Sequence, residues 1–343
     1  MSRSAFLTAL PKVELHVHLE GSISPEMAMR LALRNGVVLP GSERGEDGLR
    51  SAYVFRSFRD FLRLYVALSR SLVSVDDLRD VVVDLAERHV RAGVRYAEVT
   101  FTPLTHRARG ISADVLWSGL AEGRREAKRA WGVEYRWVFD IVRSMPHQAE
   151  ATVDFALGME ARDPGSVVGV GVGGPEADHY PMEDIGRAFD RARAAGFASL
   201  PHAGENAGAA SMWMAVRRLG ADRIGHGVRC LEDPDLVRHL RDEGIALEVC
   251  PTSNLVLNVA PSMEEHPLPQ LLAAGIPVTL GSDDPPLFGT ELIAEYERCM
   301  EAYGWDEDVV RGIVRTGIEH SFAPNALKAE LLRDVGGSPS LHR

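Results

Sequence analysis

Two histidines separated by one residue, His16 and His18, end a short apolar run that is typical of a β-strand. Side chains two positions apart on a strand share a face, so both imidazoles are expected to point to the same place. Two imidazoles on one face supply half of a tetrahedral zinc site. Histidine pairs with this spacing also occur by chance, so the pair alone is weak evidence for a metal.

Polar side chains also follow three later predicted strands, in His202-Ala-Gly-Glu205, Gly225-His226-Gly227 and Ser282-Asp283-Asp284-Pro285. Catalytic groups of α/β barrels collect at the carboxyl ends of several different strands. A capping aspartate or a hydrogen-bonded histidine explains any one of these ends, but not all four. Three histidines and one carboxylate form a donor set suited to zinc, namely His16, His18, His202 and Asp283.

The positions of the lysines indicate how many metal ions the site would hold. Two-metal hydrolases of this architecture often bridge their ions with a carboxylated lysine on the fourth strand. Lysine occurs only at Lys12, Lys128 and Lys328, away from the fourth predicted strand. The zinc motifs HExxH and PCxxC are also absent from the sequence. We therefore expect one Zn²⁺ per chain.

Short apolar runs alternate with longer amphipathic segments along the whole chain. The alternation predicts strands at Val13–Val17, Val94–Phe101, Tyr135–Ile141, Val167–Val172, Ala198–Pro201, Arg223–Gly225, Ile245–Val249 and Pro277–Leu280. It predicts helices at Asp76–Ala92, Ala113–Trp131, Glu183–Ala195, Pro234–Glu243 and Glu264–Ala274. Eight strands alternating with helices indicate an α/β fold, a (β/α)8 TIM-type barrel that makes residues 1–343 a single domain. An open doubly wound sheet is the alternative, but no glycine-rich nucleotide loop follows the first strand.

The interval between the first two strands is longer than one crossover requires. Residues of about 24–75 are expected to form a helical insertion over the barrel mouth, with helices at Pro25–Asn35 and Phe58–Leu72 and a loop at Pro40–Arg50. The insertion carries apolar residues that either line a lid or pack as core, the commoner case: Phe55, Phe58, Phe61, Leu62 and Tyr65.

Composition limits the class of partner. The 343 residues are 45% apolar and carry a net charge of −11, which disfavours nucleic acid and anionic membranes and favours a small molecule. Three separated cysteines make no disulfide framework, and no signal peptide or membrane-spanning run is apparent. We therefore expect a soluble cytoplasmic protein, and the oligomeric state stays open.

Six motifs together resemble the adenosine deaminase family of the amidohydrolase superfamily over nearly the whole chain. They are His16-Val-His18-Leu-Glu-Gly-Ser, Gly173-Gly-Pro-Glu176, His202-Ala-Gly-Glu205, Gly225-His-Gly-Val, Cys250-Pro-Thr-Ser-Asn and Ser282-Asp-Asp-Pro285. The resemblance implies a zinc-dependent hydrolase that converts a 6-aminopurine into the 6-oxopurine and ammonia. It implies that the donor set above binds zinc, that Glu205, His226 and Asp284 act on the substrate, and that the Gly174 N–H contacts purine N3.

The physical chemistry of the reaction agrees with those roles. Zinc lowers the pKa of bound water from about 15.7 to about 7, which supplies hydroxide at neutral pH. His226 would take a proton from that water or orient it. Glu205 would donate a proton to ring N1, so its pKa must be raised by a dry pocket. Asp284 would need a proton to bond N7, and neighbouring Asp283 favours that.

The substrate is less firmly indicated than the chemistry. Adenosine deaminases carry an aspartate for the ribose 5′-hydroxyl where this chain has Glu20, and the usual aspartate of the fourth strand is missing from Gly171-Val-Gly-Gly-Pro-Glu176. Relatives with glutamate include adenine deaminases and deaminases of 6-aminodeoxyfutalosine, a precursor in menaquinone biosynthesis. We expect a nucleoside, adenosine or 6-aminodeoxyfutalosine, with Glu20 at the rim of the site holding a sugar hydroxyl.

Several alternatives stay open. Free adenine is the alternative substrate. A PHP-type metal phosphatase and a non-catalytic binding protein on the same fold are remote alternatives. The histidines outside the motifs are interpreted as surface or packing residues, except that His179 could touch the substrate.

Overall fold

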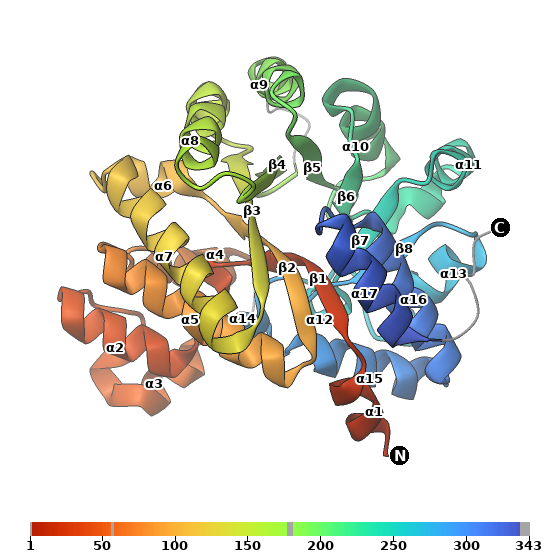
Figure 1. The fold of residues 1–343 in the computed structure, drawn as a ribbon, viewed down its shortest axis with the longest axis horizontal. Coiled ribbons are helices and arrows are strands. Elements are labelled where there is room, and N and C mark those ends of the chain that lie inside the picture. Colours follow the sequence, from red (N-terminus) through yellow and green to blue (C-terminus); the bar gives the residue numbers. More distant parts are fainter. Residues whose placement is uncertain (1, 56–57, 177–180, 337–343) are drawn as a thin grey trace.

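The computed structural model describes residues 2–55, 58–176 and 181–336. Its strands all run parallel in the order of the chain, from β1 to β8. They are β1 (Lys12–His18), β2 (Val94–Phe101), β3 (Glu134–Val142), β4 (Val167–Gly173), β5 (Ala198–Ala203), β6 (Arg223–His226), β7 (Ala246–Val249) and β8 (Val278–Leu280). Each strand overlaps the one predicted from the sequence, and the (β/α)8 barrel is confirmed (Figure 1).

The barrel closes at its carboxyl end, where the first strand meets the segment after β8. Val17 and Asp283 form an isolated parallel bridge. The His18 N–H donates to the Asp283 carbonyl at 2.8 Å, and the Asp283 N–H donates to the His16 carbonyl at 3.0 Å. Closure therefore brings three of the predicted metal ligands onto adjoining backbone.

Helices surround the barrel. The larger crossover helices are α5 (Val75–Arg91), α7 (Ala113–Trp131), α8 (Ala149–Arg162), α9 (Met182–Ala194), α10 (Ala209–Met214), α11 (Pro234–Glu243) and α13 (Leu268–Ala273). Short helices α6 (Pro103–Arg107), α12 (Pro251–Val256) and α14 (Pro285–Phe288) follow β2, β7 and β8. The N-terminal α1 (Arg3–Ala9) and the C-terminal α15 (Leu292–Tyr303), α16 (Glu307–His320) and α17 (Asn325–Val335) complete the shell. None of the helices in the described ranges combines the length and apolar character needed to cross a membrane.

Local sequence explains where these helices begin and end. The Ser74 side chain accepts from the Asp77 N–H, and the Asp77 side chain accepts from the Ser74 N–H, so α5 starts with a capping box. Helix α11 starts with Asp233 as its N-cap and ends at Gly244 with φ 67°. These signals are local, which is why the sequence predicts both boundaries closely.

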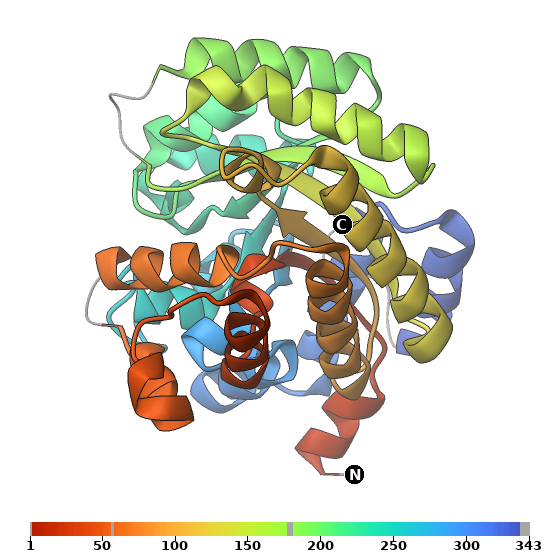
Figure 2. The same cartoon turned by 90° about the vertical axis from the view of Figure 1, so that its left-hand side faces the viewer.

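The insertion between β1 and α5 contains α2 (Pro25–Asn35), α3 (Gly45–Ala52) and α4 (Phe58–Ser69), with a 3-10 turn η2 (Ser42–Arg44) before α3. These helices gather on one side of the barrel (Figures 1 and 2). The loop predicted at Pro40–Arg50 is wrong, because most of that segment is helical. Acidic residues in the first turn of α3 and an i,i+4 pair between Glu46 and Arg50 offset the low helix propensity of its glycines.

Candidate active site

Three imidazoles and one carboxylate meet at the carboxyl end of the barrel. His18 Nε2 lies 3.2 Å from His202 Nε2 and 3.4 Å from Asp283 Oδ1. His16 Nε2 lies 3.6 Å from the same oxygen. A tetrahedral zinc ion with bonds of about 2.0–2.1 Å places its ligand atoms about 3.3 Å apart. The three separations are thus close to those that a single tetrahedral ion requires.

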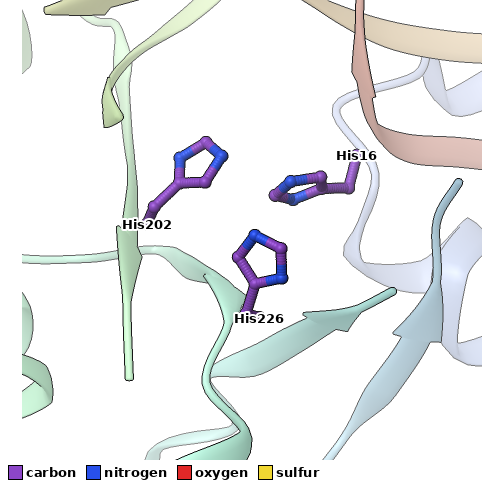
Figure 3. Close-up of side chains that lie close together, drawn as sticks. All are labelled: His16, His202 and His226. Atoms are coloured by element: carbon purple, nitrogen blue, oxygen red, sulfur yellow. The ribbon is translucent and has the colours of Figure 1, made fainter. Parts of the chain in front are cut away.

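A fourth imidazole lies beside this group. Figure 3 shows the rings of His16, His202 and His226 facing a common space. Within the described ranges, possible metal-ligand groups whose donor atoms lie within 4.8 Å of one another are His16 with His18 and Asp283, and His16 with His202 and His226. The two groups overlap at His16, so His226 lies within reach of anything bound there.

The backbone of the site is strained at two functional positions. His226 and Asp283 both have φ 62°, a region that non-glycine residues seldom adopt. Asp283 is held there by its bridge to β1, and His226 stands between two glycines. Such strain costs about 1–3 kcal/mol for each residue and persists only where the surroundings enforce it. The fold therefore imposes these two side-chain directions at a cost.

Two glycines leave space for the side chain of His16. A Cβ on Gly225 would lie 2.8 Å from His16 Cε1, and a Cβ on Gly281 would lie 2.7 Å from His16 Cβ. The ring is then fixed by Glu248, whose Oε2 lies 2.9 Å from His16 Nδ1. A proton on Nδ1 leaves the lone pair of Nε2 facing the site, the usual outer-shell arrangement of a metal-binding histidine. His16 Nε2 is buried and has no hydrogen-bond partner among the described residues.

Glu205 lies on the loop that follows β5. Four backbone N–H groups, from Gly204 to Ala207, donate to the Glu176 carboxylate and hold this loop in place. Glu205 itself is nearly buried, and its Oε1 lies 3.9 Å from His226 Nε2. Burial and the charge of Asp283 raise the pKa of Glu205 to about 8. The carboxyl group therefore holds its proton at neutral pH, as the expected role of Glu205 as a proton donor requires.

A chain of hydrogen bonds reaches His226 from outside the predicted motifs. The Leu268 N–H donates to His266 Nδ1 at 3.1 Å, so His266 carries its proton on Nε2. His266 Nε2 donates to Asn254 Oδ1 at 3.0 Å, which turns the amide nitrogen of Asn254 toward His226 Nδ1 at 3.5 Å. His226 therefore presents an Nε2–H to the site. Burial lowers the pKa of His226 to about 4, which keeps the ring neutral.

Asp284 is buried beside Asp283 and faces the cavity. Burial and the negative charge of Asp283 raise the pKa of Asp284 well above its ordinary value. Its Oδ1 has no hydrogen-bond partner among the described residues. A Cβ on Gly21 would lie 1.6 Å from that oxygen, so only glycine at this position leaves space for the Asp284 side chain. Ser253, which follows β7, donates to Asp283 Oδ2 at 2.6 Å and holds the adjoining carboxylate.

Glu20 is not on the strand from which its place at the rim of the site was predicted. The strand ends at His18, and Glu20 begins a 3-10 turn, η1 (Glu20–Ser22), so the strand spacing used to predict its position does not apply. Glu20 is fully buried, and its Oε1 accepts from the Thr102 N–H at 3.0 Å and from His106 Nε2 at 3.1 Å. Arg109 donates to His106 Nδ1 at 2.9 Å and so sets its tautomer. Glu20 Oε2 has no hydrogen-bond partner among the described residues.

A cavity of about 320 Å³ opens over the metal-ligand cluster, Glu205, His226 and Asp284, and Glu20 is not among the described residues that line it. Its floor includes His18, His202, Asp283 and Asp284, and its outer wall includes residues of α4, namely Phe61, Leu62, Tyr65 and Val66. Phe61 also packs against Phe288, with ring centroids 5.1 Å apart, so it serves both the wall and the core. Gly174, with φ 91°, lies on the same cavity. His179 lies outside the described residues.

Several site residues are missing from the sequence prediction. Asp140, at the end of β3, lies on the cavity, and burial raises its pKa to about 8. A carboxylate inside an apolar strand run is the signal that could have identified it. His106 and His266, interpreted as surface or packing residues, are buried and hold Glu20 and Asn254. Their roles depend on contacts that no local pattern encodes.

A parallel barrel with clustered histidines and carboxylates at the carboxyl ends of its strands is the arrangement of a metal-dependent hydrolase. The family described as adenosine deaminase matches residues 11–337. An aminodeoxyfutalosine deaminase of Streptomyces avermitilis is 37% identical over 334 residues, which cover 96% of this chain and 92% of that protein. An adenine deaminase of Cupriavidus necator is 39% identical over 326 residues, which cover 95% and 91%.

Solved structures agree with the sequence relatives. An adenine deaminase from Arthrobacter aurescens superposes with a TM-score of 0.89 at 33% identity and covers 95% of this chain and 98% of its own. A Burkholderia ambifaria amidohydrolase with bound Zn gives a TM-score of 0.85 at 29% identity, with coverage of 95% and 90%. The chain belongs to the adenosine deaminase family and is a hydrolytic deaminase acting on C–N bonds in amidines. The phosphatase and non-catalytic alternatives are therefore set aside.

Proposed function

We propose that this chain removes the 6-amino group of a purine nucleoside, adenosine or 6-aminodeoxyfutalosine, using one zinc ion held by His16, His18, His202 and Asp283. The observation that carries the proposal is one cavity that combines the ligand cluster with Glu205 and Asp284, two carboxyl groups whose pKa values are raised. One of these can protonate a purine ring nitrogen and the other can donate a hydrogen bond to it.

The choice of zinc rests on the donor set and its spacing. Three nitrogen atoms and one carboxylate oxygen suit a borderline ion. His16 is oriented from behind by Glu248, and Asp283 by Ser253, which fits the outer shell of a resident ion. When bound, zinc lowers the pKa of water to about 7 and so supplies a nucleophile at neutral pH.

The remaining steps belong to residues of the chain. Protonated Glu205 donates to ring N1, which makes C6 accept the incoming oxygen. His226 offers its Nε2–H to that oxygen, because Asn254 occupies its other nitrogen. The hydrogen-bond chain thus favours the orienting role of His226 over the role of first proton acceptor. Protonated Asp284 donates to N7, and the Gly174 N–H contacts N3. After the hydroxide oxygen has bonded to C6, the C6–N bond breaks and the amino group leaves as ammonia with the proton of the added hydroxyl, which forms the 6-oxopurine. The proton lost when the water ionised restores protonated Glu205.

The preference for a nucleoside rests on the outer cavity. The aromatic wall from Phe61 and Tyr65 suits an apolar group beyond the purine, such as the phenyl ring of 6-aminodeoxyfutalosine. We also propose that Glu20 holds a sugar hydroxyl with its Oε2, since its Oε1 is already anchored to Thr102 and His106. Free adenine is the second candidate, because relatives of comparable identity are adenine deaminases.

Two measurements test this proposal. Elemental analysis of the active protein should give one zinc per chain. Ammonia release should then be compared for adenosine, 6-aminodeoxyfutalosine and adenine by kcat/KM. A sugar contact worth about 1.5–3 kcal/mol predicts that the better nucleoside exceeds adenine by about 10- to 150-fold. Faster turnover of adenine than of both nucleosides would overturn the substrate assignment, and two tightly held ions would overturn the single-zinc site.

A further inference from the structure

The β3 carboxylate of Asp140 faces a histidine that the proposed function makes a metal ligand. Asp140 Oδ2 lies 3.8 Å from His202 Nδ1. Both His202 Nδ1 and Asp140 Oδ1 are buried without a hydrogen-bond partner among the described residues. On its other edge, His202 Nε2 faces His18 Nε2 at 3.2 Å. The two edges of the ring thus face different groups, the ligand cluster and Asp140.

The tautomer of His202 follows from this placement. A lone pair on Nε2 is needed for a metal, and a neutral imidazole then carries its proton on Nδ1. A buried N–H without an acceptor costs about 1–3 kcal/mol. Asp140 is the acceptor that the structure offers to this N–H. A separation of 3.8 Å is longer than a hydrogen bond, and a shift of less than about 1 Å would close it.

The fourth strand is shaped to admit this carboxyl group. A Cβ on Gly171 would lie 2.1 Å from Asp140 Oδ1, and a Cβ on Gly173 would lie 2.5 Å from Asp140 Oδ2. Any larger residue at either position would displace the carboxyl group. The glycine-rich run of β4, Val-Gly-Val-Gly-Val-Gly from Val168 to Gly173, is therefore a cradle for a side chain of β3.

The neighbouring part of β3 holds the same histidine by its backbone. Arg143, which follows β3, donates from NH2 to the His202 carbonyl oxygen at 2.6 Å. We propose that Asp140 is a positioning residue that accepts the Nδ1–H of His202 and so directs its Nε2 to the metal. This role rests on the proposed metal site, and it explains both the buried carboxyl group and the glycines around it.

The test measures metal affinity on the full chain. The zinc dissociation constant is measured by chelator competition for the wild type, Asp140→Ala and Asp140→Asn, after circular dichroism has shown that each is folded. Loss of an outer-shell partner predicts a 10- to 100-fold weaker affinity for Asp140→Ala. Asp140→Asn keeps an oxygen acceptor of the same shape, so it should recover part of that loss.

Two glycine substitutions give a matched pair. Gly171→Ala places a Cβ against Asp140 Oδ1 and 2.8 Å from the Leu200 carbonyl. Gly169→Ala, on the same strand face, places a Cβ 2.8 Å from the Ala198 carbonyl and against Leu200, away from Asp140. Both crowd a carbonyl of β5 equally. Only Gly171→Ala should weaken zinc binding, by a factor similar to that of Asp140→Ala.

The outcomes separate this role from the alternatives. A wild type with one zinc and an Asp140→Ala variant within about twofold of its affinity would overturn the role of Asp140 alone. A raised KM at unchanged zinc affinity would reassign Asp140 to substrate contact. An equal loss of zinc affinity in the two glycine variants would mean that these glycines serve the packing of the strands and do not position Asp140. A wild type that binds no metal would overturn the proposed metal site, and this role with it.

Discussion

Two clusters of buried charges lie in the barrel, and they differ in how completely they are paired. In the interior, Arg223 donates to Glu248 Oε1 at 2.7 Å, to Glu98 and to the His320 carbonyl at 2.9 Å. At the mouth, the carboxyl groups of Asp140 and Asp284 each keep an oxygen with no hydrogen-bond partner among the described residues. Both clusters are removed from water, but among the described residues the interior carboxylates form ion pairs with an arginine and these two mouth oxygens have no partner.

The difference in pairing changes the protonation of the carboxyl groups. Burial would raise the pKa of Glu248, but Arg223 and His16 lower it below its ordinary value. At the mouth, burial and neighbouring negative charges raise the pKa of Glu205 to about 8 and that of Asp284 well above its ordinary value. A buried carboxylate paired with arginine supports the fold, and an unpaired carboxyl group is available for proton transfer.

The largest effect should come from removing the acid at the mouth. Glu205→Gln keeps the shape and hydrogen bonding of the side chain and abolishes its proton transfer. We expect kcat to fall by about 10²- to 10⁴-fold, with zinc retained. Turnover and metal content measured on the same sample check this. Near-normal turnover would assign the acid to another residue.

The dependence of kcat/KM on pH is a second test of the role of Glu205. A carboxyl group with a pKa of about 8 is protonated below that pH, so wild-type kcat/KM should hold there and fall as the pH rises through about 8. The residual activity of Glu205→Gln should lack this alkaline limb. An alkaline limb that persists in the variant would belong to a different group.

The next effect concerns the interior cluster and should appear in stability. Arg223→Met leaves Glu98 and Glu248 buried without their cation, which should lower the free energy of unfolding by about 3–5 kcal/mol. Denaturant unfolding of the apoprotein measures it. The control is Arg129→Met, an exposed arginine whose ion pair within the described part of the chain is with Glu126, and it should change stability by less than about 0.5 kcal/mol. An equally small change for Arg223→Met would remove the contrast between the two clusters.

The smallest effect is expected at Glu20, where one oxygen is anchored and the other has no hydrogen-bond partner in the described part of the chain. Glu20→Ala should lower kcat/KM for a nucleoside by about 10- to 150-fold through loss of a charge-assisted hydrogen bond. Free adenine, which has no sugar, should lose little. His106→Ala removes a hydrogen bond that anchors Glu20, so it should also lower kcat/KM more for the nucleoside than for adenine, by a smaller factor. Equal losses on adenine and nucleoside would mean that Glu20 serves only the structure of the site.

The sequence by itself determined the barrel and the ends of its strands. Strand and helix periods and caps are local, so β2 is predicted to the residue and β1 to within one residue at each end. Because parallel strands carry their carboxyl ends to one edge, the positions of His16, His202, His226 and Asp283 in the chain already implied that they meet. The family match confirms the enzyme class that these motifs indicate.

Only the tertiary structure decided which groups surround those residues. Glu20 meets His106 across 86 residues of chain, and it is buried in a 3-10 turn and not on the strand that its spacing suggested. Asp140 lies 3.8 Å from His202 because two glycines on a third segment leave it space. The tautomer of His226 is set through Asn254 in α12 and His266 in the segment between α12 and α13. These contacts depend on packing between distant segments, and a periodic pattern in one segment carries no information about the side chains of another.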